Sequence, residues 1–230
     1  MRTMRILSSI LLAGAIAAPV LADDDAKDAA KKLQEATDVI QTAVTSPDKG
    51  IPKSLLQKAE CVGVFPEVKK GAFVVGAEFG RGVFTCRRED GKMSAPAFFS
   101  VGAGSVGFQV GAEETDYVLL VMNKEGMKHL LDDKFTIGGE LAAAAGPVGR
   151  EAEAATDAQL HAQILTWSRS RGLFAGASLE GSVVKSDKSR MEKFYGKPVT
   201  AKTVLVDQKM AVPNAARSFV DTTNKHASRS

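Results

Sequence analysis

Apolar residues recur at helical spacing near the start of the chain. Between Ala26 and Val44 they stand three or four positions apart among alanine, lysine, glutamate and glutamine, at Leu33, Ala36, Ile40 and Val44. This spacing predicts an amphipathic helix over 26–44. Residues 46–50 (Ser-Pro-Asp-Lys-Gly) are typical of a turn, and a second short helix is expected over 52–60.

The pattern changes at Cys61, where short runs of valine, phenylalanine and glycine replace the alanine and lysine. Such runs, bounded by turn residues, predict strands. We expect strands near 61–65, 72–79, 82–88, 96–101, 105–112 and 116–122, and later near 140–146, 162–168, 173–178 and 180–185. A helix is expected over 123–132, and helical or mixed segments over 187–195 and 213–225.

Glycine is frequent inside these strand segments, with 21 glycines in the chain. Glycine weakens a strand, so its presence there indicates bends, bulges or close backbone approach. A strongly curved sheet needs such positions. The sequence therefore predicts a single α+β domain, in which curved, mostly antiparallel, glycine-rich strands form a barrel or sandwich flanked by helices.

The first 22 residues have the pattern of a secretion signal. Arg2 and Arg5 precede an uncharged, mostly apolar run over 6–18. That run is shorter than the roughly 20 residues needed to span a bilayer as a helix. Small residues then precede an acidic stretch that begins at Asp23. We expect cleavage after Ala22, a domain over 23–230 and a periplasmic location, with peripheral contact to a membrane. An uncleaved membrane anchor is the alternative.

The net charge of the chain argues against one class of function. The chain has 30 basic and 27 acidic residues, and removal of Arg2 and Arg5 leaves 28 against 27, a formal charge of +1. A general nucleic-acid-binding surface needs a clear basic excess, so we exclude nucleic acid as a partner.

Cys61 and Cys86 are the two cysteines of the chain, 25 positions apart. In an oxidising compartment an even pair is expected to form a disulfide. Two buried free thiols are the alternative.

Motifs for catalysis are weak. The stretch Gly102 to Gly107 has the glycine spacing of a dinucleotide-binding loop, but that loop requires a following helix and the next residues predict strand. Ser105 is near the pattern of a hydrolase nucleophile elbow, which also needs a strand-to-helix turn. The three histidines are isolated, and neither cysteine has a closely spaced second ligand. We therefore expect no enzyme activity, no metal and no cofactor, and keep a Ser105 hydrolase as a minor hypothesis.

Several basic residues remain as candidates for binding an anionic ligand. Lys69 and Lys70 are expected in a turn, Arg169 and Arg171 flank an expected turn, and Arg150 follows a glycine-rich stretch. If these residues share one face, they can hold anionic lipid head groups, at about 1 kcal/mol each. Scattered solubilising charges are the alternative.

A series of motifs resembles the SYLF family of lipid-binding domains, whose members include eukaryotic actin-patch regulators and exported bacterial proteins. The motifs occur in order over roughly residues 33–222: CVGVFP at 61–66, GRGV at 80–83, SAPA at 94–97, GSVGFQVG at 104–111, GPVGR at 146–150, SRSRGLFAG at 168–176, LEG at 179–181 and FYG at 194–196.

The resemblance implies non-enzymatic binding of membrane phospholipids, of phosphoinositides in eukaryotic members, and of actin in some of them. It also implies lipid contact by the N-terminal helix, here with Lys27, Lys31 and Lys32, and by the later basic residues. We expect an exported protein to meet anionic lipid rather than actin. A structural envelope protein that binds another protein is the alternative.

Overall fold

The computed structural model describes residues 21–46, 50–72, 75–106, 111–149, 159, 161–170 and 172–228. The described strands form one nine-stranded sheet in the order β5-β9-β3-β2-β1-β4-β7-β6, with β8 paired to β7. The pairs are antiparallel except β6 with β7. The strands are β1 (Cys61–Ala72), β2 (Val75–Cys86), β3 (Ala97–Val106), β4 (Gly111–Val121), β5 (Lys134–Thr136), β6 (Ala143–Ala145), β7 (Ile164–Ser170), β8 (Leu173–Gly176) and β9 (Val183–Ser186).

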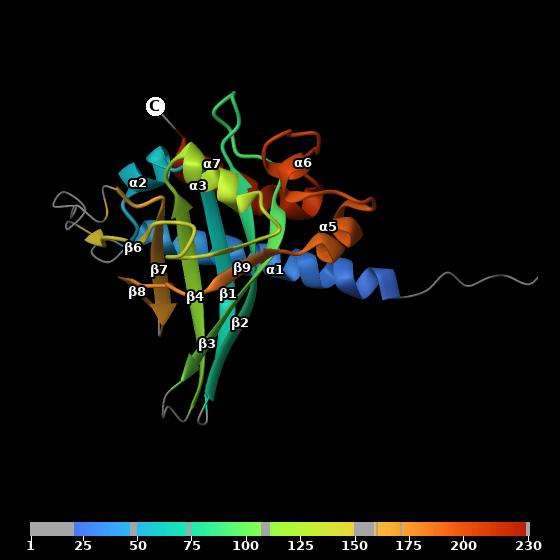
Figure 1. The fold of residues 1–230 in the computed structure, drawn as a ribbon. Coiled ribbons are helices and arrows are strands. Elements are labelled where there is room, and N and C mark those ends of the chain that lie inside the picture. The colour runs from blue at the N-terminus through green and yellow to red at the C-terminus, as the bar shows by residue number, and fades with distance from the viewer. Residues whose placement is uncertain are drawn as a thin grey trace, which may run out of the picture.

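Helices pack against this sheet, as Figure 1 shows. The long helix α1 lies against β1, β2, α5 and α7. The helices are α1 (Leu21–Thr45), α2 (Lys53–Lys58), α3 (Lys124–Leu130), α5 (Lys188–Tyr195), α6 (Ala201–Leu205) and α7 (Arg217–Ala227), the last preceded by the 3₁₀ turn η2 (Asn214–Ala216). The predicted α+β domain is confirmed, as a curled half-barrel with helices from both ends of the sequence.

The periodicity of the first helix is explained by burial. Leu33, Ala36 and Ile40 are fully buried, and Val44 is partly buried against the same core. The helix packs its apolar side on the sheet and on α7, so these residues belong to the core of the domain.

Four long strands replace the shorter strands predicted between 61 and 122. Gly80 was expected to lie between two strands, but it is inside β2. A Cβ atom at Gly80 would lie 2.3 Å from Val68 Cγ2, and one at Gly82 would lie 2.3 Å from the Val64 carbonyl oxygen. These glycines permit close strand packing rather than a turn, and the expected break in β2 is wrong for that reason.

Lys69 and Lys70 were also expected in a turn, and this prediction is wrong. Both lie in β1, beyond a bulge between Val64 and Lys69. Since side chains alternate along a strand, the two lysines point to opposite faces of the sheet. The expected turn around Ser170 lies later, because Arg169 and Ser170 are still in β7.

The inner face of the sheet, which is the face opposite α5, carries an aromatic cluster. Phe84 contacts Phe65 and Phe99 edge to face, with ring centroids 5.7 and 5.0 Å apart. On the opposite face of the sheet, Trp167 is fully buried and donates a hydrogen bond from Nε1 to the Pro147 carbonyl, 3.0 Å away. Such aromatic burial supplies much of a domain's core energy.

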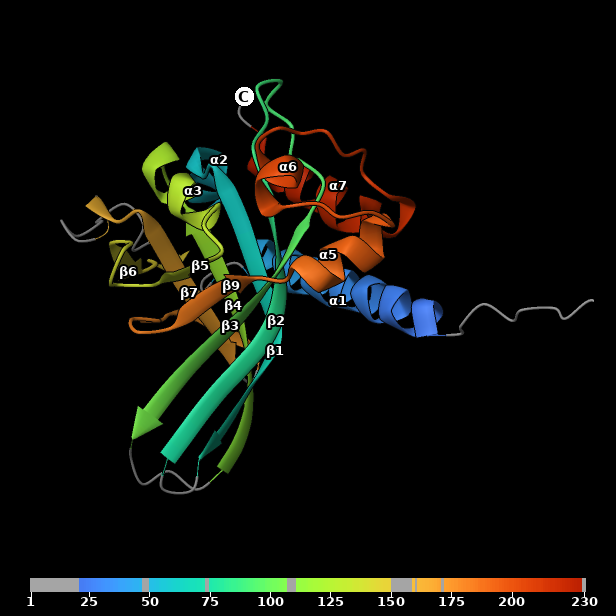
Figure 2. The same cartoon turned by 45° about the vertical axis from the view of Figure 1, so that its right-hand side comes forward.

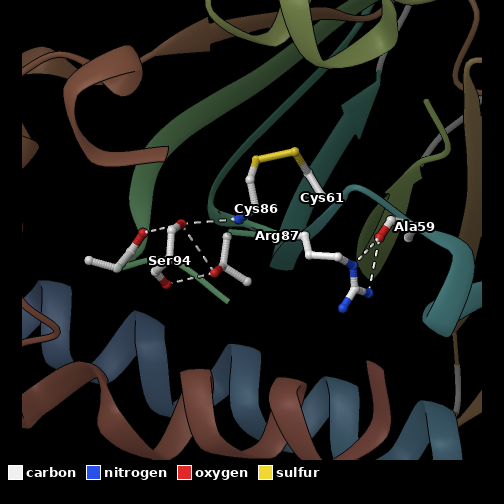
Figure 3. The surroundings of a disulfide bond; sticks show 7 residues. Ala59, Cys61, Cys86, Arg87 and Ser94 are labelled. Carbon is white, nitrogen blue, oxygen red and sulfur yellow. Dashed lines mark hydrogen bonds between the residues drawn. A yellow bond between two sulfur atoms is a disulfide. The ribbon is translucent and has the colours of Figure 1, made fainter. Parts of the chain in front are cut away.

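Cys61 and Cys86 form a disulfide, as predicted (Figure 3). The two residues face each other directly in the β1–β2 register. The neighbouring backbone is fixed by Ser94, whose Oγ accepts from Cys86 N at 3.1 Å. The bond therefore links two central strands that already pair.

Strands β1, β2, β3 and β4 extend past the helices, as Figure 2 shows. Their far ends include Ala72 of β1 and Val106 of β3. In both views these ends are uncovered by helices. Much of the sheet surface near them faces solvent.

Candidate surface for anionic ligands

The outer face of the sheet, defined here as the face on which α5 packs, carries the candidate site. Phe98 of β3 contacts Phe194 of α5, with ring centroids 5.0 Å apart. Ser100 lies two residues further along β3 and so points to the same face. Arg81 of β2 and Lys185 of β9 stand directly opposite Ser100 on its two neighbouring strands.

A row of cations crosses four strands at this level. Lys134 of β5 pairs with Lys185, which extends the register to Arg81, Ser100, Lys185 and Lys134. Directly opposed residues of antiparallel strands point to the same side. Arg81, Lys134 and Lys185 are exposed and Ser100 is half-buried. We call these four residues the cationic row.

No ion pair is recorded for Arg81, Lys134 or Lys185 within the described part of the chain. Arg81 instead lies over the ring of Phe79, 5.9 Å from its centroid. Three like charges side by side repel each other, so the row favours an anion over it.

An apolar row runs beside the cationic row, about 7 Å along the strands. Its register is Phe79, Gly102, Val183 and Thr136, on the same four strands. Phe79 is 55% exposed and Val183 is 39% exposed. Gly102 leaves bare backbone between them, because a Cβ there would meet only the Glu78 carbonyl, at 3.5 Å. The outer face is therefore amphipathic, with charge at one level and exposed apolar side chains at the next.

The lysines predicted for lipid contact lie on α1, where neighbouring acidic residues offset the positive charge of two of them. Lys31 Nζ lies 3.2 Å from Glu35, and Lys32 Nζ also pairs with Glu35. Burial acts to raise the pKa of Glu35, but its hydrogen bonds and charge contacts with Lys32 and Lys31 hold this pKa below its ordinary value. Lys27 is exposed. The helix therefore presents less free positive charge than its lysine count indicates.

The structure brings Lys32 and Arg169 into one network. Arg169 Nε donates to Asp116 at 2.6 Å, and the other oxygen of Asp116 accepts from the backbone N–H of Glu67. The Glu67 carboxylate lies 4.0 Å from Lys32 Nζ. Glu67 has φ of 52° at the β1 bulge, and this network fixes that unusual backbone. Arg169 is thus paired and half-buried.

Lys69 and Lys70 are separated by their strand geometry. Lys69 points to the outer face and lies 3.8 Å from Glu114. Lys70 is 3.6 Å from Glu78 and 5.4 Å from the ring centroid of Tyr117. Burial, with the charge of Glu78, raises the pKa of Tyr117. Arg150 and Arg171 lie outside the described residues.

The motifs weighed for catalysis lie in extended backbone. Gly102, Gly104 and Ser105 belong to β3, and the next described element is strand β4. Ser105 is therefore not at a strand-to-helix elbow. Among the described residues no group of three or more histidine, cysteine, aspartate or glutamate side chains is placed to hold a metal ion. No helix in the described ranges is both long and apolar enough to cross a membrane.

The chain also matches known proteins. Residues 102–226 match the family Ysc84, described as "Las17-binding protein actin regulator". This chain belongs to the Ysc84 family, whose domain is the SYLF domain. The resemblance predicted from the ordered motifs is confirmed.

Relatives in the Ysc84 family include the human SH3 domain-containing YSC84-like protein 1, 36% identical over 182 residues, which cover 79% of this chain and 52% of the relative. The LAS seventeen-binding protein 3 of Saccharomyces cerevisiae is 36% identical over 184 residues, covering 79% of this chain and 39% of the relative. Protein YSC84 of the same yeast is 34% identical over 195 residues, 84% and 41% of the two chains. This chain thus matches about half or less of each relative. The family description and the name of the yeast LAS seventeen-binding protein 3 refer to binding and actin regulation rather than to an enzyme activity.

The sequence patterns did not predict the cationic row. Arg81 belongs to the GRGV motif, whereas Lys134 and Lys185 belong to none of the motifs. Over one hundred positions separate Arg81 from Lys185, so their pairing depends on the strand order β2-β3-β9.

Proposed function

We propose that this protein binds anionic phospholipid at a membrane surface, without catalysis, through the outer face of its sheet. The observation that carries the proposal is the cationic row beside the exposed apolar row. Arg81, Lys134 and Lys185 would lie at the level of the lipid head groups. Phe79 and Val183 would reach the boundary with the acyl chains.

The charges set the strength of this contact. Each basic residue near an anionic surface contributes about 1 kcal/mol, so the three cations supply roughly 3 kcal/mol. Partial burial of Phe79 and Val183 adds about 1 kcal/mol. The resulting association is weak, reversible and sensitive to salt, since exposed charges are screened within about 10 Å at 0.1 M ionic strength.

The proposed setting is the periplasmic side of a membrane, after cleavage following Ala22. The support is the N-terminal pattern of two arginines, an apolar run and small residues. The disulfide between Cys61 and Cys86 also suits an oxidising compartment.

The lysines of α1 and the other predicted basic residues would have a secondary role in this proposal. Lys31 and Lys32 share Glu35, and Lys69 is close to Glu114. Their partners reduce the net charge that a membrane meets. Lys27, which is exposed, would contribute as α1 approaches the surface.

A substitution at the centre of the cationic row tests the proposal. Ser100→Glu places a carboxylate between Arg81 and Lys185, whereas Ser100→Gln adds a side chain of the same size without charge. In co-sedimentation with anionic vesicles, Ser100→Glu should weaken binding at least about fivefold relative to Ser100→Gln. Neutral vesicles should bind neither variant, and high salt should release the wild type.

Equal binding by the two Ser100 variants would place the contact elsewhere, and Lys27, Lys31 and Lys32→Gln would then be the next substitutions. A protein partner is the second candidate function, favoured by the family description as a Las17-binding protein. It predicts no sedimentation with any vesicle.

A further inference from the structure

A hollow opens on the outer face where β9 ends and α5 begins. Its volume is about 410 Å³, within the range of small-molecule sites. It is lined by residues of β2, β3, β9 and α5, among them Phe79, Arg81, Ser100, Lys185, Ser186 and Lys188.

The acidic residues that line the hollow already have partners. Asp133 lies 2.7 Å from Lys188 Nζ. Asp187 caps α5 by accepting a hydrogen bond from Arg190 N at 3.1 Å. Arg81 and Lys185 have no recorded ion pair in the described part of the chain. Two positive charges in the hollow are therefore not matched by an acid.

A hydroxyl group lies between these two cations. Ser100 stands between Arg81 and Lys185 in the strand register. The two outer strands lie about 10 Å apart, so both long side chains can reach a group above Ser100.

We propose that this hollow binds a phosphomonoester group. A phosphomonoester carries a charge of about −1.5 to −2 at pH 7, which matches Arg81 plus Lys185. A phosphodiester carries about −1 and leaves one cation unmatched. The guanidinium of Arg81 can hold two phosphate oxygens, and the Ser100 hydroxyl can donate to another. The remaining volume fits a small polyol that carries the phosphate.

The phosphomonoester has two sources, a lipid head group or a free phosphorylated small molecule. The lipid source rests on the proposed function, whereas the free source does not. Two arms of one experiment separate them. In solution, calorimetry compares glycerol 3-phosphate, a monoester, with glycerophosphoglycerol, a diester. On membranes, co-sedimentation compares phosphatidic acid vesicles with phosphatidylglycerol vesicles of matched surface charge.

The test variant is Arg81→Gln/Lys185→Gln, and the matched control is Arg217→Gln/Lys128→Gln, which removes the same charge from exposed positions on α7 and α3. Folding of both is checked by the fluorescence of the buried Trp167. Monoester binding should be preferred in both arms. The test variant should lose about 30-fold on vesicles, about fivefold for each cation, while the control keeps nearly full binding.

Other outcomes decide between the claims. Preference for the monoester in solution with no vesicle binding would support the hollow with a free ligand and reject the proposed membrane function. Vesicle binding without monoester preference would overturn the phosphomonoester site and leave membrane binding intact. Equal losses in the two double variants would also overturn the site, because net charge alone would explain them.

Discussion

Arg87 follows β2 directly, and its guanidinium joins the ends of two helices to the sheet. The residue is only 9% exposed. Its Nη2 donates to the carbonyl of Ala227, the last residue of α7, at 2.8 Å. Nε and Nη2 both donate to the carbonyl of Ala59, just past the end of α2, at 3.2 and 3.1 Å (Figure 3). Nη1 donates to the Gly91 carbonyl at 3.0 Å.

Replacing Arg87 by methionine keeps much of the apolar stem and removes every one of these donors. A hydrogen bond to a charged group is worth about 1.5–3 kcal/mol, and a buried acceptor left unpaired adds a penalty. The carbonyl groups of Ala59, Gly91 and Ala227 lose a donor, as do those of Leu56 and Gln57, but some regain water. We therefore expect Arg87→Met to lower the free energy of unfolding by about 4 kcal/mol. Arg87→Lys keeps the charge but not the planar guanidinium, and it should lower the free energy of unfolding by about half as much.

Urea unfolding followed by Trp167 fluorescence measures these changes, because the single tryptophan is fully buried. Arg217→Met is the control, since Arg217 is exposed and its loss should change stability by less than about 0.5 kcal/mol. An Arg87→Met protein within about 1 kcal/mol of wild type would refute the reasoning, and would mean that packing alone holds α2 and α7.

Three further predictions concern the disulfide, a glycine and a histidine. Replacing both Cys61 and Cys86 by alanine should lower the free energy of unfolding by about 3 kcal/mol, and a urea midpoint equal to wild type would contradict this. Gly82→Ala should destabilise by about 1–3 kcal/mol because its Cβ meets the Val64 carbonyl at 2.3 Å, whereas Gly104→Ala, with nothing within 4 Å, should not. Burial, followed by the charges of Lys225 and Lys53, lowers the pKa of His226, so the folded state disfavours its protonation. Stability should therefore fall as the pH drops below about 6.5, and His226→Gln should reduce that fall in thermal unfolding measured from about pH 7.5 to about pH 5.5; an unchanged pH profile would reject it.

The sequence predicted the elements whose signals are local. The helix over 26–44 follows from apolar residues three and four apart, and Leu33 and Ile40 are buried as that spacing requires. The disulfide followed from an even pair of cysteines and an expected compartment. The ordered motifs identified the family, which local periodicity alone could not do.

Features that depend on contacts between distant residues were missed or misplaced. Gly80 was expected between two strands, but it lies inside β2, where an added Cβ would meet Val68 on the neighbouring strand. Lys69 and Lys70 follow a bulge that only the pairing of β1 with its neighbouring strands reveals. Lys32 likewise has a second acid within 4.0 Å, Glu67, which is distant in sequence.

The cationic row is the clearest case of a site hidden from sequence. Arg81, Ser100, Lys185 and Lys134 come from four strands, and none is unusual among its sequence neighbours. A one-residue change of register in β9 would turn Lys185 to the inner face. The site therefore exists only once the sheet is assembled in its correct order.

Lysine footprinting on vesicles tests the central claim most directly, because it reports which face meets the membrane in the unaltered protein. The purified protein is acetylated with and without anionic vesicles, and the reactivity of each lysine is measured by mass spectrometry. The account predicts that vesicles protect Lys134 and Lys185 while Lys128 on α3 reacts as before. Protection confined to Lys27 and Lys31 on α1, with Lys134 and Lys185 still reactive, would contradict it.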